Sequence, residues 1–109
     1  MYILAVDNER NMLGELVAEL QTVFPKVQIQ GETEALAALD WVRTLAEENR
    51  TLAYAFLDIH MAGMNGVELA KQVKMLHPGV KLIFLLGRYR ICVRGDAYVC
   101  EGVFAQACQ

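Results

Sequence analysis

The chain has 109 residues, of which 55% are hydrophobic and 21% charged, and its formal net charge is −3. This length and apolar content predict one soluble globular domain over residues 1–109, with no separate effector domain. The acidic balance disfavours direct nucleic-acid binding, and no apolar run reaches the ~20 residues of a membrane span, so we expect a cytoplasmic protein.

The three cysteines, Cys92, Cys100 and Cys108, form no C-x-x-C pair and leave one thiol over. This spacing predicts neither a disulfide framework nor a structural metal site, and it suits a reducing compartment.

The first half of the chain alternates strand and helix patterns. Residues 2–6 predict a strand, which is followed by Asp7, Asn8 and Glu9. An apolar stripe at helical spacing comes next, with Asn8 or Asn11 as its cap and Pro25 as its stop. The stripe consists of Leu13, Leu16, Val17, Leu20 and Phe24. Residues 27–29 predict a short second strand.

A second helix is expected to open at Thr33 and Glu34 and to close at residues 49–50. Its inward stripe is predicted to be Leu36, Leu39, Val42 and Leu45 or Ala46. Residues 52–57 are almost wholly apolar, as in a strand that is covered on both faces. A third helix over residues 65–76 and a fourth strand over residues 81–85 complete this part.

This alternation predicts an α/β fold, a three-layer doubly wound parallel sheet with the flavodoxin-like strand order 2-1-3-4-5. Asp7 follows the first strand and Asp58 the third. Since parallel strands end at a common edge of their sheet, and ligands gather there, we expect both carboxylates in one pocket.

The motifs ILAVDNE, from residue 3, and LDIHMAGMNGVEL, from residue 57, resemble the receiver (CheY-like) domain of two-component response regulators. The resemblance covers residues 1–84, although Ala62 stands where the family usually has proline. It implies that Asp58 is the phosphoacceptor of a sensor histidine kinase, and that the chain works in phosphorelay signalling and not as an enzyme.

The resemblance also implies a Mg²⁺ site made by Asp7, Asn8, Asp58 and the backbone carbonyl of His60. Mg²⁺ prefers such oxygen ligands and keeps some waters. Because Asn8 replaces an acid of the family, we expect weakened Mg²⁺ binding, with Glu9 as a possible accessory acid.

Residues 85–109 depart from the family pattern. Leu86 stands where receivers have Thr or Ser, and Glu101 is the nearest match to their lysine. These degenerate switch positions predict an impaired readout of phosphorylation. The segment is also too short for the fourth helix, fifth strand and fifth helix of the family, so we expect this region to be truncated or altered. We also expect an exposed apolar edge and a homodimer formed through the C-terminal third.

Two origins for this segment remain open. Read one base later, codons permitted by the segment can encode S-A-D-T-E-Y-A-C-E-A-M-R-M-S-A-R-A-Y-L-L-K-P-A, which restores the hydroxyl residue and a Y-L-L-K-P ending. The chain is then a frameshifted product of a response-regulator gene, which would continue into an effector such as a transcription regulator. The alternative is a naturally divergent, shortened receiver.

Two other functions are compatible with parts of this sequence. The first is a phosphorylation-independent protein-interaction module that keeps the fold. The second is a Mg²⁺-dependent phosphatase with Asp58 as nucleophile, which is disfavoured because His60 stands where such enzymes need a second Asp as the acid and base.

The coding DNA tests the frameshift hypothesis. We expect the codons of residues 85–109, read one base later, to specify a hydroxyl residue near the start and Y-L-L-K-P near the end. Codons that do not specify these residues would establish divergence instead.

Overall fold

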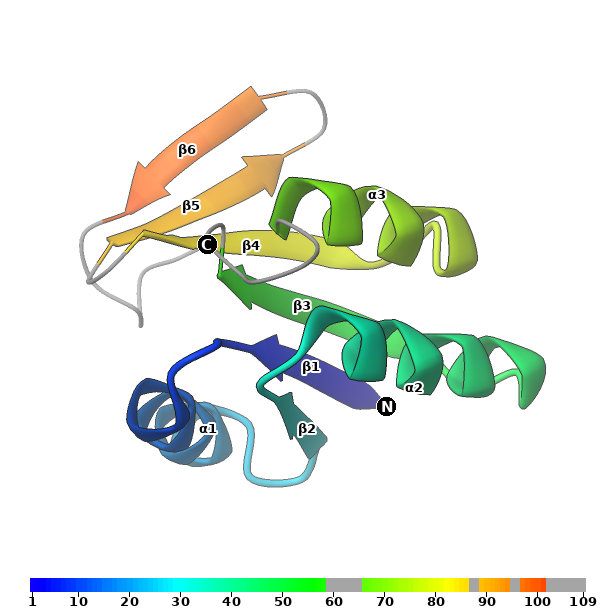
Figure 1. Ribbon diagram of the computed structural model, residues 1–109, viewed down its shortest axis with the longest axis horizontal. Coiled ribbons are helices and arrows are strands. Elements are labelled where there is room, and N and C mark those ends of the chain that lie inside the picture. Colours follow the sequence, from blue (N-terminus) through cyan, green and yellow to red (C-terminus); the bar gives the residue numbers. More distant parts are fainter. Residues whose placement is uncertain (59–65, 87–88, 95–96, 102–109) are drawn as a thin grey trace.

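The protein folds around a single six-stranded sheet in the order β2-β1-β3-β4-β5-β6 (Figure 1). The computed structural model describes residues 1–58, 66–86, 89–94 and 97–101. The strands are β1 (Tyr2–Val6), β2 (Gln28–Glu32), β3 (Leu52–Asp58), β4 (Lys81–Leu86), β5 (Tyr89–Arg94) and β6 (Ala97–Glu101). The helices within the described residues are α1 (Arg10–Val23), α2 (Ala35–Glu47) and α3 (Gly66–Leu76).

The first four strands form the parallel sheet that the alternating pattern predicts. β1 pairs in parallel with both β2 and β3, and β3 pairs in parallel with β4. The α/β class and the parallel order 2-1-3-4 are therefore confirmed. β3 extends one residue beyond its predicted end and includes Asp58 itself.

A complete flavodoxin-like order has a parallel fifth strand beside β4, and this chain differs at that position. β5 occupies it but runs antiparallel to β4, and β6 pairs antiparallel with β5. Only Gly87 and Arg88 separate β4 from β5, which is too little chain for a crossover helix. Parallel neighbours need a long crossover, so a two-residue connection permits only an antiparallel partner.

The sheet is covered on both faces, and side chains alternate between two apolar layers along the central strands. Leu4, Val6, Leu57 and Phe84 pack in the layer beneath α2 and α3. Ile3, Ala5, Phe56 and Ile83 pack in the layer on the side of α1. Figure 1 shows this separation, with α2 and α3 side by side on one face and α1 on the other.

The inward face of α2 is rotated from the predicted stripe. Leu36 was expected in the core but is 70% exposed. Its place is taken by Ala35 and Ala38, which join Leu39, Val42 and Leu45 in the buried set. The prediction favoured the larger side chain, whereas the close packing of α2 against the sheet admits alanine at these positions.

The start of α1 also differs from the prediction. Glu9 is the N-cap residue of α1, without a side-chain cap hydrogen bond, so Asn8 and Asn11 do not cap it.

No described helix is both long and apolar enough to cross a membrane.

The end of α2 agrees with the predicted closure at residues 49–50. Asn49 has a positive φ of 58°, and its N–H donates to the carbonyl of Ala46. The N–H of Arg50 donates to the carbonyl of Leu45. This pair of bonds is a Schellman motif, in which asparagine accepts the left-handed conformation that most residues avoid.

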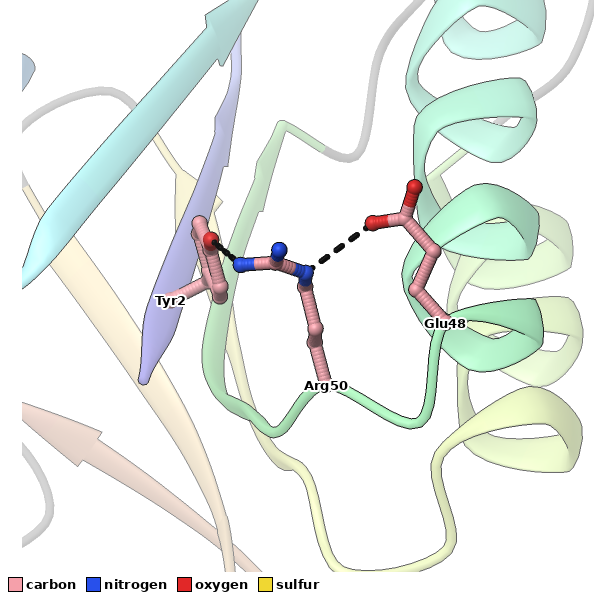
Figure 2. A network of polar contacts seen from close by, with 3 residues as sticks. All are labelled: Tyr2, Glu48 and Arg50. Atoms are coloured by element: carbon pink, nitrogen blue, oxygen red, sulfur yellow. Dashed lines mark hydrogen bonds and ion pairs between the residues drawn. The ribbon is translucent and has the colours of Figure 1, made fainter.

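Arg50 then links the end of α2 to the start of β1, as Figure 2 shows. Its Nη1 donates to the Tyr2 hydroxyl oxygen at 2.6 Å, and its Nε lies 3.0 Å from a Glu48 carboxylate oxygen. Both charged side chains are about half exposed, so we attribute only a small stabilisation to this ion pair. The network lies at the edge of the sheet opposite Asp58.

Candidate phosphoacceptor site

Two neighbouring parallel strands bring Asp7 and Asp58 together. Val6 is in register with Leu57, so the residues that follow them, Asp7 and Asp58, reach the same edge of the sheet. The N–H of Asp7 donates to the carbonyl of Glu32 at 3.2 Å, which extends the β1–β2 ladder and fixes the backbone here. The strand register therefore brings the two carboxylates together, as the sequence predicts.

The Asp7 carboxyl lies in an environment that disfavours its negative charge. The side chain is 9% exposed, and burial raises its pKa above the ordinary value of 3.8. The Glu9 N–H, which donates to Asp7 Oδ1 at 2.9 Å, opposes this rise. The negative charges of Asp58 and Glu9 and a hydrogen bond with the Asp58 side chain raise the pKa further.

The hydrogen bond between Asp7 and Asp58 means that their carboxyl oxygens are near enough to share a proton. A divalent cation between them would replace that proton and remove the repulsion of two ionised carboxylates. The donor atoms are hard oxygens at the mouth of a parallel sheet, which suits Mg²⁺ or Ca²⁺. The residues present therefore fit a divalent cation.

Within the described ranges, no three His, Cys, Asp or Glu side chains converge as a metal site. A cation held by Asp7 and Asp58 would complete its shell with an amide oxygen, backbone carbonyls or waters. That is the kind of shell that Mg²⁺ prefers.

The other predicted ligands are Asn8, the accessory acid Glu9 and the backbone carbonyl of His60. Asn8 and Glu9 are exposed beside the pocket, and the charge of Glu9 reaches Asp7. His60 lies outside the described residues. The carboxylate pair is thus the part of the predicted site that the structure brings together directly.

Leu86 and Glu101, the two predicted degenerate switch positions, lie on different strands. Leu86 is the last residue of β4, one position beyond Leu85, which pairs with Asp58. Glu101 pairs with Arg90, and Arg90 pairs with Leu85. Three interstrand spacings, about 14 Å, therefore separate the backbones of Asp58 and Glu101. A fifth strand directly beside β4 would have placed that residue one spacing nearer.

The Glu9 backbone has a structural role that the sequence patterns did not predict. Its N–H binds the Asp7 carboxylate two residues earlier, as in an Asx turn. The available signal was an aspartate between a strand end and a helix start, where its side chain can bind the N–H two residues on.

Several solved structures are similar to this fold. A CheY-like receiver domain protein from Methanospirillum hungatei JF-1 is 26% identical, with a TM-score of 0.64 over 76% of this chain and 61% of its own. A response regulator from Burkholderia pseudomallei, solved with a phosphorylated aspartic acid, calcium ion and citrate, is 17% identical, with a TM-score of 0.66 over 79% of this chain and 46% of its own. An adenylate cyclase from Rhodopirellula baltica is 20% identical, with a TM-score of 0.65 over 78% of this chain and 58% of its own.

The chain thus has the receiver fold of response regulators, and the resemblance seen in residues 1–84 is confirmed. It spans less than two thirds of the length of the three solved chains just described. No protein-family model matches the sequence, and no curated protein matches it either.

We expect Asp7→Asn to stabilise the protein at neutral pH. Because the pKa of Asp7 is raised in the folded state, ionising it costs stability as pH rises from 3.8 through the folded pKa. Asparagine carries no charge, and its Oδ1 can still accept from the Glu9 N–H. Thermal unfolding should show a gain of a few degrees at neutral pH that disappears below pH 3.8.

Asp40→Asn is the matched control, because Asp40 is exposed on α2. It should leave the pH dependence unchanged. A stability curve for Asp7→Asn that runs parallel to the wild-type curve at all pH values would show that Asp7 carries no strain.

Proposed function

We propose that this chain is a phosphoacceptor signalling module in which Asp58 receives a phosphoryl group from a sensor histidine kinase. The observation that supports this most directly is the contact between the Asp7 and Asp58 carboxyls at the carboxyl edge of the parallel sheet. Two acids at this edge provide both a nucleophile and a cation site. In this role the chain would act in the cytoplasm, as a step of a phosphorelay.

The proposed reaction is a phosphoryl transfer between side chains. A carboxylate oxygen of Asp58 attacks the phosphorus of a phosphohistidine, a P–O bond forms, and the P–N bond to the imidazole breaks. The departing imidazole nitrogen keeps the bonding electrons and takes up a proton. Transfer of this kind depends mainly on position and on neutralising the charge of the phosphoryl oxygens.

Asp7 and Asp58 would hold Mg²⁺, with Asn8, the His60 carbonyl and waters as further oxygen ligands and Glu9 nearby. The cation would neutralise charge on the transferred group. The Glu9 N–H positions Asp7 through its hydrogen bond to Oδ1. Asp7 would therefore be a fixed ligand, while Asp58, at the last position of β3, would present the nucleophile.

We further propose that the response to phosphorylation is impaired. Leu86, at the end of β4, has no hydroxyl group to bind the phosphoryl oxygens. The antiparallel β5–β6 hairpin also stands in place of the parallel strand and helices of a complete receiver. Phosphorylation can then occur without the rearrangement that a hydroxyl residue would report.

Treatment with acetyl phosphate and Mg²⁺ tests the acceptor. We expect intact-mass measurement to show one added phosphoryl group on the wild-type chain, because both carboxylates of the pocket are present. Asp58→Asn should abolish the gain, and Asp40→Asn, an exposed acid on α2, should retain it.

An unchanged wild-type mass would favour the phosphorylation-independent interaction module. The same gain in Asp58→Asn would move the acceptor to another residue.

Asn8→Asp tests the metal shell. Asn8 is exposed and adjacent to Asp7, so a carboxylate here should tighten Mg²⁺ binding about tenfold in calorimetric titration if position 8 ligates directly. Asn11→Asp makes the same chemical change on an exposed face of α1 and should have little effect. Equal affinities for wild type and Asn8→Asp would place residue 8 outside the ligand shell.

A further inference from the structure

A groove runs between α3 and β4, on the face of the sheet that α2 and α3 cover. Its volume is about 490 Å³. Ala70, Leu82 and Phe84 line it from the two elements, and Val67 and Met75 lie further along α3. Lys71 and Lys74 also line the groove.

The groove exists because no described helix lies beyond α3 on this face. β4 leads into β5 after Gly87 and Arg88 alone, so no crossover helix can form between these strands. Figure 1 shows α3 as the outermost described helix, with the β5–β6 hairpin beyond β4. The apolar side of α3 that faces away from α2 therefore forms one wall of the groove.

The exposure of the lining residues supports an interaction surface. Met75 is 77% exposed and Val67 is 44% exposed. They lie eight residues apart on α3, which corresponds to about 12 Å or two helical turns. Phe84, by contrast, is only 5% exposed and provides a fixed apolar base. A rigid apolar channel of this length suits the apolar stripe of one short helix.

The charges identify the kind of helix. Lys71 and Lys74 are both exposed, and Lys74 Nζ donates to the Val80 carbonyl at 3.1 Å, which holds this ammonium group at the groove. Two positive charges beside an apolar channel, one of them held in place by its hydrogen bond, favour an acidic partner. A second copy that packed this same face here would add its own Lys71 and Lys74 to the interface, and the extra positive charge disfavours that arrangement.

We propose that this groove binds an amphipathic helix of a partner protein, one that carries acidic residues beside its apolar stripe. Apolar side chains at positions i, i+3 or i+4, and i+7 would enter the channel between α3 and β4. Acidic side chains on the flank would pair with Lys71 and Lys74. This interaction does not require the proposed phosphorylation of Asp58.

The test uses the full chain and a fluorescein-labelled helical peptide with leucines at i, i+3, i+4 and i+7, flanked by glutamates. Fluorescence anisotropy should show saturable binding that weakens as salt is raised. Lys71→Glu should weaken binding about tenfold at low salt, because an attraction becomes a repulsion. Lys26→Glu is the matched control, since Lys26 is exposed but does not line the groove.

Met75→Ser tests the apolar contact in the same assay and should also weaken binding several-fold. Leu36→Ser is its control, because Leu36 is 70% exposed on α2 and lies outside the groove. Amide chemical-shift changes on adding the peptide should cluster on α3 and β4. These spectra also establish that each variant remains folded.

Several outcomes would overturn the proposal. These are no binding up to about 1 mM peptide, equal binding of a peptide with lysines in place of the glutamates, or equal losses in the control variants. Displacement of the peptide by anionic phosphatidylglycerol vesicles would assign the surface to a membrane. Self-association that Met75→Ser abolishes would assign it to a second copy of the chain.

Discussion

The in-register parallel pairing of β1 with β3 is the constraint on which the site depends. Val6 opposite Leu57 brings Asp7 to the level of Asp58. A slip of one residue would turn one set of side chains to the opposite face and separate the two carboxylates. The register is maintained by alternating apolar side chains, because Leu4 and Val6 must reach one layer of the core while Ile3 and Ala5 reach the other.

The same pairing explains why a buried acid is tolerated beside a second acid. Asp7 accepts a hydrogen bond from the Glu9 N–H, which offsets part of the cost of burial, but the Asp58 side chain is also within hydrogen-bonding reach. A carboxyl pair held in this way stores unfavourable electrostatic energy that a proton or a cation relieves. The strands thus place two acids where a positive charge would relieve their repulsion.

Much of this arrangement was predictable from the sequence. Asp7 and Asp58 each terminate an apolar run, and the topology rule for parallel sheets places such residues at one edge. The rotation of α2 was less accessible, because Leu36 and Ala35 both fit a helical stripe and only close packing against the sheet distinguishes them. The cap of α1 was also missed, since Asn8 and Asn11 have the right chemistry but the helix begins at Arg10.

The hairpin at the C-terminal end had a sequence signal that the family resemblance obscured. Gly87-Arg88 and Gly95-Asp96 are two-residue connections that begin with glycine, between segments rich in residues typical of strands. Glycine in the first position suits the tight turns that join antiparallel neighbours. The expectation of a parallel fifth strand near residue 100 gave these local patterns too little weight.

The antiparallel hairpin also divides the chain into two kinds of folding problem. About fifty residues of chain separate β1 from β3, so their pairing carries a larger loop-closure entropy than a hairpin does. The β4–β5 and β5–β6 pairs close two-residue connections, whose contacts are local in sequence. Since rates of formation fall as contacting residues become more distant along the chain, we expect the hairpin pairs to form before the acid pocket, which needs closure of the long loop.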